Sequence, residues 1–164
     1  MGSIIKISAI VAIDKNNLMG MDNGIPWHIP ADLENFKDLT EGKAVVMGRN
    51  TWESLPVKPL PNRLNMVVSG DANFYIDHPV MNAYSLEDAM DSLYWGIDEV
   101  FIIGGARMYK DAAPIVGTLY LTRVNREIED NGTGVYFPIE SYEGFIERSR
   151  IDYKTHTNYV YVRN

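Results

Sequence analysis

The chain has 164 residues, a formal net charge of −7 and no cysteine. These values predict one domain, residues 1–164, that can bury a sizeable core, and they exclude disulfides and thiolate chemistry. The acidic balance and the absence of a Lys/Arg run argue against nucleic acid or a membrane surface as a partner. No apolar stretch approaches the roughly 20 residues that span a bilayer, and no secretory signal is evident, so a cytoplasmic protein is expected. Residues 1–3 could be a cloning remnant and are given no role.

The first third of the chain predicts a strand, a long loop and a helix. Ile4–Ile13 is a nearly continuous apolar run with β-branched residues, which is typical of a buried central strand. A polar loop at 14–24 follows, and loops of this length inside a domain are more often functional than idle. Pro30 suits the first turn of a helix, and Gly42 can end that helix.

Shorter elements follow. Asn50 is expected to cap a short helix, with Glu53 completing a capping box. Ser85 opens another helix, which Gly96 closes. The remaining predicted segments are strands at 44–47, 64–69, 100–103, 118–128, 144–153 and 158–163, a Pro-rich loop at 55–62, a helix inner stripe of Leu86, Ala89, Met90 and Leu93, and a helix from 106 to near Pro114.

The order of these elements predicts the fold class. The first two-thirds of the chain alternates strands with helices, whereas the last third reads as antiparallel strands. We predict a three-layer α/β sandwich with a central mixed, mostly parallel eight-stranded sheet, about four flanking helices and a C-terminal antiparallel hairpin. In such sheets, ligands bind at the carboxyl ends of the parallel strands.

One carboxylate stands out because of its surroundings. Asp32 lies four residues before Phe36, so both side chains share a helix face, and Leu33 flanks them. A carboxylate there would be partly desolvated, which raises its pKa unless a cationic ligand pairs with it. The alternative is an aspartate that only favours the helix dipole. Trp27 and the loop before it can roof a cleft over Asp32, which favours the functional interpretation.

Two turns have the features of phosphate sites. Gly48-Arg49-Asn50-Thr51 and Gly104-Gly105-Ala106-Arg107 each follow a buried strand and open a helix. Glycine lets the backbone approach a ligand closely, and free helix N–H groups with an arginine can hold a pyrophosphate. Neither turn matches a P-loop or the G-x-G-x-x-G fingerprint, which disfavours a nucleotide kinase and a Rossmann fold.

Other chemistries find little support in the sequence. The three histidines, His28, His78 and His156, are scattered, and no metal-binding pattern occurs, so no metal is expected. Ser54 has no evident histidine partner, and no nucleophile motif is present. The eight Met and ten Tyr are most simply core and edge-strand residues.

The chain resembles dihydrofolate reductase of the bacterial type from Ile4 onward. The family's motifs occur in its order and at nearly its spacing, as Ile25-Pro26-Trp27, Pro30-Ala31-Asp32-Leu33, Val46-Met47-Gly48-Arg49-Asn50-Thr51-Trp52-Glu53-Ser54, Leu60-Pro61-Asn62-Arg63, Ile103-Gly104-Gly105 and Leu119-Tyr120-Leu121-Thr122. The resemblance implies NADPH-dependent reduction of 7,8-dihydrofolate to tetrahydrofolate, with hydride transfer to pterin C6 and protonation at N5. This reaction supplies one-carbon metabolism.

The resemblance also implies which residues bind the substrate. Asp32 would hydrogen-bond the pterin 2-amino group and N3, Thr122 would bond to Asp32, and Trp27 would hold a water nearby. Arg63 would grip the α-carboxylate of the glutamate tail, which suits a bidentate fork. The implied substrate-binding residues are Ser8, Ile10, Asp32, Leu33, Phe36, Ser54, Leu55, Lys58, Leu60, Arg63, Ile103 and Thr122.

The implied cofactor site comprises both turns and a mobile lid over the nicotinamide, residues 18–25. Tyr109 would lie close to the nicotinamide and is counted with Asp32, Trp27 and Thr122 as catalytic. Ser69 and Gly70 would bind the 2′-phosphate with Arg49. The implied cofactor-binding residues are Ile10, Leu18, Met19, Gly20, Asn23, Gly24, Ile25, Gly48, Arg49, Asn50, Thr51, Ser69, Gly70, Ile103, Gly104, Gly105, Ala106, Arg107, Met108 and Tyr109.

The chain departs from the family pattern before Phe137-Pro138. The family often has an aspartate there that latches the closed lid, whereas this loop is longer and places Gly134 near that position. Asp130 is the expected substitute. The resemblance further implies a monomer and an antifolate target. The alternatives are a related pterin or pyrimidine reductase of the same fold, which Arg63 disfavours, and a folate- or nucleotide-binding protein without turnover. A purely structural domain would not require an acid among apolar pocket residues.

Overall fold

The computed structural model describes residues 4–93 and 96–164, so the segment 1–3 lies outside it. Its helices are α1 (Pro30–Thr40), α2 (Arg49–Ser54), α3 (Leu86–Asp91), α4 (Ala106–Ala112) and the 3₁₀ turn η1 (Ile139–Tyr142). Its strands are β1 (Lys6–Ile13), β2 (Leu18–Gly20), β3 (Ala44–Gly48), β4 (Leu64–Val68), β5 (Met81–Ala83), β6 (Glu99–Ile102), β7 (Thr118–Val124), β8 (Val135–Tyr136), β9 (Phe145–Asp152) and β10 (His156–Arg163).

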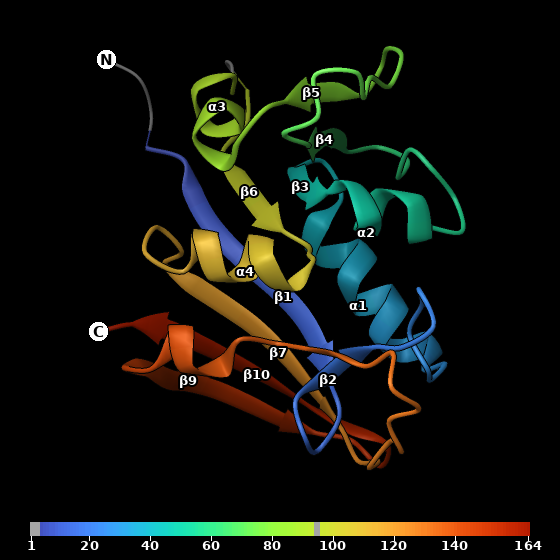
Figure 1. The fold of residues 1–164 in the computed structure, drawn as a ribbon. Coiled ribbons are helices and arrows are strands. Elements are labelled where there is room, and N and C mark those ends of the chain that lie inside the picture. The colour runs from blue at the N-terminus through green and yellow to red at the C-terminus, as the bar shows by residue number, and fades with distance from the viewer. Residues whose placement is uncertain (1–3, 94–95) are drawn as a thin grey trace.

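Eight of these strands form one mixed sheet in the order β5-β4-β3-β6-β1-β7-β10-β9. Neighbouring strands from β5 through β7 are parallel, and the hairpin β9–β10 adds antiparallel pairs at one edge. The predicted fold class is therefore confirmed, including the sheet size and the C-terminal hairpin. Figure 1 shows this hairpin in red at the opposite edge from β5.

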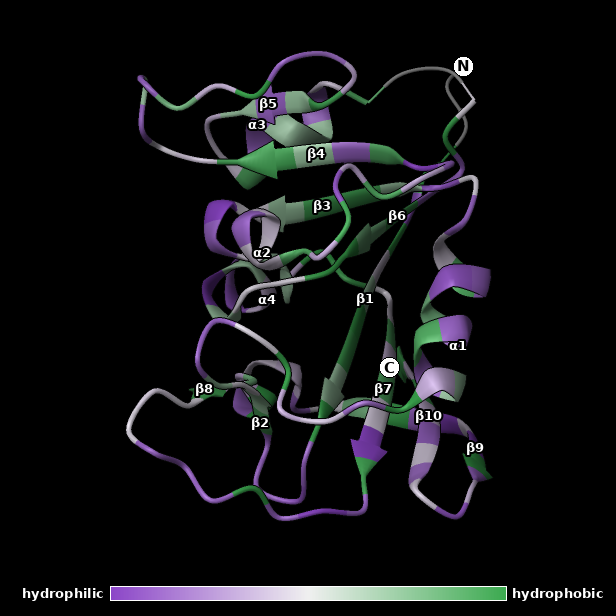
Figure 2. Cartoon of the chain, turned by 90° about the vertical axis from the view of Figure 1, so that its right-hand side faces the viewer, coloured by the Kyte–Doolittle hydropathy of each residue, from purple (hydrophilic) through white to green (hydrophobic). Residues whose placement is uncertain are grey.

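The sheet separates two apolar clusters, because successive side chains on a strand point to opposite faces. Ala9 and Val46 belong to a cluster that α3 and α4 cover, whereas their neighbours Ile10 and Val45 belong to a cluster that α1 and α2 cover. The molecule therefore has three layers (Figure 1). The central strands are mostly hydrophobic in colour in Figure 2, whereas α1 carries both colours, as expected for buried strands and an amphipathic helix.

Local sequence explains where α1 begins and ends. Pro30 occupies the first turn, where its missing N–H costs nothing, and Asp32 adds an acid near the positive end of the helix dipole. Gly42 has φ +78°, a left-handed conformation that ends a helix at little cost for glycine. The predicted extent of this helix is confirmed. None of the helices in the described residues is both long and apolar enough to cross a membrane.

The structure corrects several predicted elements. The capping box is wrong, because α2 begins at Arg49 after Gly48 and has no side-chain cap, while Glu53 accepts from Arg49 Nε at 3.0 Å. The short strand β2 lies in the segment 14–24 that was predicted as a loop, and β5 lies in a segment for which no element was predicted. The predicted helix that opens at Ser85 ends at Asp91, well before Gly96, and the strand predicted to reach 128 ends at Val124.

Candidate functional site

Asp32 and Thr122 form the polar centre of the candidate site. Asp32 lies in the first turn of α1, and Thr122 lies on β7 with its side chain almost fully buried. The Thr122 hydroxyl Oγ1 lies 2.7 Å from Asp32 Oδ1 and donates a hydrogen bond to it. Burial raises the pKa of Asp32, and this effect exceeds the opposing effects of the Thr122 hydrogen bond and the attraction of His156.

Predicted substrate residues gather on the same face of the sheet as α1. Ile10 is buried there, and the half-buried residues that pack on its cluster include Phe36, Leu55, Leu60 and Ile103. These residues come from β1, α1, the loop after α2 and the position directly after β6, so the fold brings together side chains that are far apart in the sequence. Leu33, beside Asp32, is 52% exposed and available to contact a ligand.

Arg63 lies at the end of this apolar group. Its Nη1 donates to Thr40 Oγ1 at 3.1 Å, its Nε donates to the Pro61 carbonyl at 2.8 Å, and its guanidinium carbon lies 5.9 Å from the centre of the Phe36 ring. Partial burial lowers the pKa of Arg63 from its ordinary value, although the group stays charged at neutral pH. A guanidinium fixed beside an apolar surface suits an anionic ligand with an aromatic body.

The two glycine turns predicted to bind phosphates touch each other. The Gly48 backbone N–H donates to the Gly104 carbonyl at 2.9 Å, which joins the ends of β3 and β6. Gly104 has φ +131°, and a Cβ atom there would lie 3.1 Å from Thr51 Oγ1. Only glycine therefore fits at Gly104, and the two turns form one continuous backbone surface at the carboxyl edge of the sheet.

Arg49 extends this surface toward β4. Its guanidinium carbon lies 4.3 Å from the centre of the Phe74 ring, and its nitrogens contact Glu53 at 3.0 Å and Asp71 at 3.3 Å. Ser69 accepts from the Asp71 N–H and lines a hollow of about 260 Å³. The full lining is Val67, Ser69, Ala72, Phe74, Tyr75, Asn82, Ala83 and Tyr84. A cation above an aromatic ring at a small hollow fits a nucleotide that carries a phosphate.

Tyr109 is a buried link between layers and does not expose its hydroxyl. The hydroxyl donates to the Ile10 carbonyl at 2.7 Å, and the Tyr142 hydroxyl donates to the Tyr109 carbonyl at 2.7 Å. Burial raises the pKa of Tyr109, which favours the neutral phenol. Its ring edge would lie 3.6 Å from a Cβ on Gly104, so it limits the space at this turn. Met108 beside it packs into the core.

The predicted lid, residues 18–25, divides into a fixed and an exposed part. Leu18 is fully buried, and β2 pairs with β8. Asp22 and Asn23 have φ of 54° and 60°, and Met21 and Gly24 exchange two backbone hydrogen bonds of 2.9 and 3.1 Å, which makes a tight turn at the tip. Mobility is therefore expected only in this tip and in Ile25, which is 58% exposed.

The lid is latched differently from the prediction. Asp130 accepts hydrogen bonds from the N–H groups of Gly132 and Gly134 and from the hydroxyl of Tyr136. Within the part of the chain that the structure describes, it accepts none from the lid, so its predicted contact with the lid is wrong. A side chain at Gly134 would collide with the Asp130 carboxylate. The acid that joins the two loops is Asp22 on the lid.

Asp22 receives its partners from the loop that precedes β8. Asn131 Nδ2 donates to both carboxylate oxygens at 3.1 and 2.9 Å, and Thr133 Oγ1 donates at 2.9 Å. The Asp22 N–H in turn donates to Thr133 Oγ1 at 3.0 Å. The carboxylate is therefore on the lid and its donors are on the loop before β8. The prediction was the reverse, with the acid on that loop and its contact on the lid.

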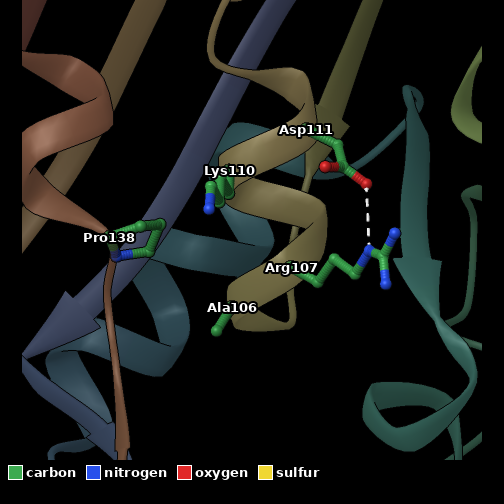
Figure 3. Close-up of a pocket in the computed structure, with 5 residues that line it drawn as sticks. All are labelled: Ala106, Arg107, Lys110, Asp111 and Pro138. Carbon is green, nitrogen blue, oxygen red and sulfur yellow. Dashed lines mark ion pairs between the residues drawn. The ribbon is translucent and has the colours of Figure 1, made fainter.

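Four predicted site residues have other contacts. Ser8 is fully buried and its hydroxyl donates to Glu99 at 2.8 Å, which argues against its predicted contact with the substrate. Ser54 Oγ donates to the Thr51 carbonyl at 2.8 Å, and Lys58 Nζ donates to the Glu53 carbonyl at 3.1 Å. Arg107 lies 3.6 Å from Asp111 on the exposed side of α4, at a separate hollow of about 390 Å³ (Figure 3).

The remaining predicted residues stay predictions. Trp27 is half-buried in the segment before α1, Gly70 is exposed after Ser69, and Asn50 and Thr51 lie in the first turn of α2. Sequence reasoning missed Asn158, which lies 2.9 Å from the Thr122 hydroxyl, as well as Asp22 and Asp71. The pairing of β7 with β10 creates the Asn158 contact, and no local pattern could have indicated it. Among the described residues, no cluster of potential metal ligands occurs.

Comparisons with known proteins identify the family. Residues 6–163 match the family model described as dihydrofolate reductase. A dihydrofolate reductase of Neisseria meningitidis serogroup A is 40% identical over 162 residues, which is 97% of both chains. One from Bacillus subtilis is 45% identical over 125 residues, 75% of this chain and 71% of the relative.

A solved structure agrees with the sequence relatives. The dihydrofolate reductase from Enterococcus faecalis, complexed with NADP(H) and RAB-propyl, superimposes with a TM-score of 0.85. The two chains are 27% identical, and the alignment covers 97% of this chain and 96% of the other. The sequence match and the structural match thus point to the same family. This chain belongs to the dihydrofolate reductase family.

Proposed function

We propose that this chain catalyses the NADPH-dependent reduction of 7,8-dihydrofolate to 5,6,7,8-tetrahydrofolate. The family match carries the reaction, and the Asp32–Thr122 pair is the single structural observation that carries the proposed mechanism. A partly buried carboxylate on an apolar face, held by one hydroxyl donor, suits a flat heterocycle that presents neighbouring N–H groups. In a pterin these groups are the 2-amino group and N3.

Asp32 acts as a fixed negative charge in this mechanism. Its carboxylate binds the 2-amino group and N3 of the pterin, and it favours the form of the ring that carries an extra proton. An anion in a site of low dielectric stabilises positive charge that develops as N5 becomes protonated. Because Asp32 holds the opposite side of the pyrimidine ring, the proton for N5 comes from solvent and not from Asp32.

The apolar cluster and Arg63 bind the rest of the substrate. Phe36, Leu55 and Leu60 contact the pterin and the aminobenzoyl ring, and Arg63 pairs with the α-carboxylate of the glutamate tail. The 5.9 Å separation between the Arg63 guanidinium and the Phe36 ring supports this assignment, because the substrate also joins an aromatic ring to a carboxylate through a short link. Remote contacts of this kind hold the reacting ring in place.

The residues at the carboxyl edge of the sheet fit NADPH. When bound, NADPH supplies the hydride that is transferred to pterin C6. The joined turns at Gly48 and Gly104 let a pyrophosphate approach the backbone, since a Cβ at Gly104 would close that space. Ser69 lines the hollow that fits an adenosine, and Arg49 lies over the ring of Phe74, another lining residue. In this proposal Arg49 and Ser69 bind the 2′-phosphate, with Gly70 beside them. Tyr109 supports the nicotinamide end through its packing against Gly104.

The lid excludes water from the reacting atoms. Asp22 latches its exposed tip, and Leu18 anchors the segment in the core. We assign Met19, Gly20, Asn23, Gly24 and Ile25 to contacts with the cofactor. Exclusion of water strengthens the effect of the Asp32 charge. We also propose that the protein acts as a cytoplasmic monomer and that antifolates bind the substrate site, as in the family it resembles.

A spectrophotometric assay tests the proposed function directly. The loss of NADPH absorbance is followed after adding dihydrofolate. One parallel reaction contains NADH in place of NADPH, and another is a blank without dihydrofolate. Rapid loss of NADPH absorbance only in the presence of dihydrofolate supports the proposal. Tight NADPH binding without turnover would instead assign the chain to another reducible heterocycle or to a binding role.

A further inference from the structure

The Thr122 hydroxyl has two oxygen neighbours and only one hydrogen to donate. Its Oγ1 lies 2.7 Å from Asp32 Oδ1 and 2.9 Å from Asn158 Oδ1. A hydroxyl carries one O–H donor and two acceptor lone pairs, so it cannot donate to both oxygens at once. The two ends of an asparagine amide are interchangeable by a rotation of the side chain, and the hydrogen-bond network decides which end faces Thr122.

The sheet register fixes this contact. Asn158 on β10 lies directly opposite Thr122 on β7 in an antiparallel pair. Directly opposed residues in such a pair have their Cβ atoms about 4.5–5.5 Å apart, so the two side chains are held within reach of one another. Asp32 approaches Thr122 from α1, which makes Thr122 the central member of a row that joins a helix and two strands.

The charge of Asp32 determines the orientation of the row. When Asp32 is ionised, its carboxylate can only accept hydrogen bonds, so the Thr122 hydrogen turns toward it. Asn158 then satisfies a lone pair of the Thr122 oxygen with its Nδ2–H group. A hydroxyl that accepts one hydrogen bond becomes a stronger donor in the next, because bonds in a chain polarise one another.

We propose that Asn158 is a positioning residue of this site, whose amide N–H donates to Thr122 and thereby directs the single hydroxyl hydrogen of Thr122 to Asp32. Asn158 acts only through Thr122 and supports the fixed negative charge that the mechanism requires. This inference rests on the proposed role of Asp32. It assigns to β10 a function in the site in addition to its place in the sheet.

The proposal predicts the direction in which a substitution changes the Asp32 titration. Hydrogen bonds to an ionised acceptor are roughly twice as strong as those between neutral groups, so the loss of Asn158 penalises the ionised form more than the neutral form. The pKa of Asp32 should therefore rise in Asn158→Val, by about half a unit if one bond in the row is weakened.

His156 must be followed in the same experiment. His156 lies on the same face of β10 as Asn158, two residues away, and its attraction lowers the pKa of Asp32. Its Nδ1 lies 2.9 Å from Thr155 Oγ1, and its ring stacks on Tyr153. The titration of the His156 ring resonances shows whether a change in Asp32 arises from His156 instead of Thr122.

A double-mutant cycle tests the proposal on the ligand-free protein. The Asp32 carboxyl carbon is titrated by ¹³C NMR in the wild type, Asn158→Val, Thr122→Val and the double variant, and Asp32→Asn identifies its resonance. The expected result is a rise of about half a unit for Asn158→Val in the wild-type background and no change in the Thr122→Val background. An equal shift in both backgrounds, or no shift in either, overturns the proposal.

Two further variants keep the test decisive. Asn158→Ala gives the same prediction if Val at this position prevents folding. Thr157→Val is the matched control, because Thr157 lies on the opposite face of β10 and donates to Asp152 at 2.9 Å. It should lower the thermal unfolding midpoint without moving the Asp32 titration. The titration needs no turnover, so a failed cycle is distinguishable from a protein that does not reduce dihydrofolate.

Discussion

The Thr122 hydroxyl donates a hydrogen bond of 2.7 Å to the Asp32 carboxylate, and this contact joins the last parallel strand of the sheet to the first turn of helix α1. The bond favours the ionised carboxylate, whereas burial disfavours it. Burial is the larger effect and raises the pKa of Asp32. Asp32 is the only charged side chain proposed to bind the pterin, and its burial in the site costs folding free energy.

The first prediction concerns that cost. The native pKa of Asp32 is raised above the unfolded value near 3.8, so the unfolded state releases its proton at lower pH than the native state. Stability is therefore lost as pH rises from the unfolded pKa through the native one, and the cost is absent below both values. Asp32→Asn removes the cost and keeps an acceptor for Thr122. It should raise the free energy of unfolding at pH 7.

Urea unfolding of both proteins between pH 4 and pH 8 checks this prediction. The gain in Asp32→Asn should shrink as the pH falls and become small at about pH 4, near the unfolded pKa of an aspartate. Asp38→Asn, an exposed acid on the same helix, is the matched control and should give a small difference at every pH. A destabilised Asp32→Asn at pH 7 would show that the carboxylate contributes to folding instead.

The second prediction concerns Arg63. Arg63→Ala removes a charged contact that is remote from the reacting atoms, so it should raise KM for dihydrofolate about 10- to 100-fold with little change in kcat. Lys58→Ala, which removes an exposed cation from the preceding loop, should change KM far less. Steady-state kinetics at saturating NADPH measure both variants. An unchanged KM in Arg63→Ala would reject its assignment to the glutamate carboxylate.

The third prediction concerns Asp71, whose carboxylate lies 3.3 Å from the Arg49 guanidinium. Asp71 competes with a 2′-phosphate for Arg49, so Asp71→Asn should tighten NADPH binding about two- to fivefold and leave NADH binding unchanged. The Asn side chain can still accept from the Asn73 N–H, as Asp71 does at 2.9 Å. Calorimetry with both cofactors measures the effect, with Asp77→Asn as the control.

High salt supplies an independent check on Asp71. The gain in NADPH affinity should decrease as ionic strength rises, because the Arg49 and Asp71 side chains are 44% and 51% exposed to solvent. Tightening of NADH binding by the same factor would place Asp71 at the adenosine instead of the phosphate.

The fourth prediction concerns the lid latch. Asp22→Ala removes the acceptor of the hydrogen bonds from Asn131 and Thr133. Amide exchange at the lid tip, read at Asp22 and Gly24, should become roughly 5- to 10-fold faster. Asn131→Ala should act in the same direction and Glu129→Ala should not. Unchanged exchange in Asp22→Ala would mean that the backbone pairing of β2 with β8 holds the lid without the latch.

The sequence predicted the parts of this molecule that depend on local pattern. A long apolar run indicated β1, a short one indicated β3, and Pro30 and Gly42 marked the limits of α1. The short strand β5 was missed because its three residues form a strand only by pairing with β4. The strand β2 pairs with β8 more than 110 residues later, a relation that no local window contains.

The site shows the same division between local and distant signals. Asp32 was predicted from its helix position, and Gly104 from a glycine turn between a buried strand and a helix. The Asp22 latch and the Asn158 contact were missed because they depend on how loops and strands meet in three dimensions. The capping box failed for a local reason, since Gly48 preceded the helix and Glu53 paired with Arg49 instead.

The most direct test of the account is the rate of hydride transfer in Asp32→Asn, measured by stopped flow with NADPH and dihydrofolate, together with the Kd for NADPH. Asn keeps the shape and one acceptor but removes the charge. The account predicts a fall in the rate of at least about 100-fold at pH 7, because the charge acts mainly on the transition state, with NADPH affinity unchanged. A hydride-transfer rate close to that of the wild type, or an equal loss of NADPH binding, would contradict it.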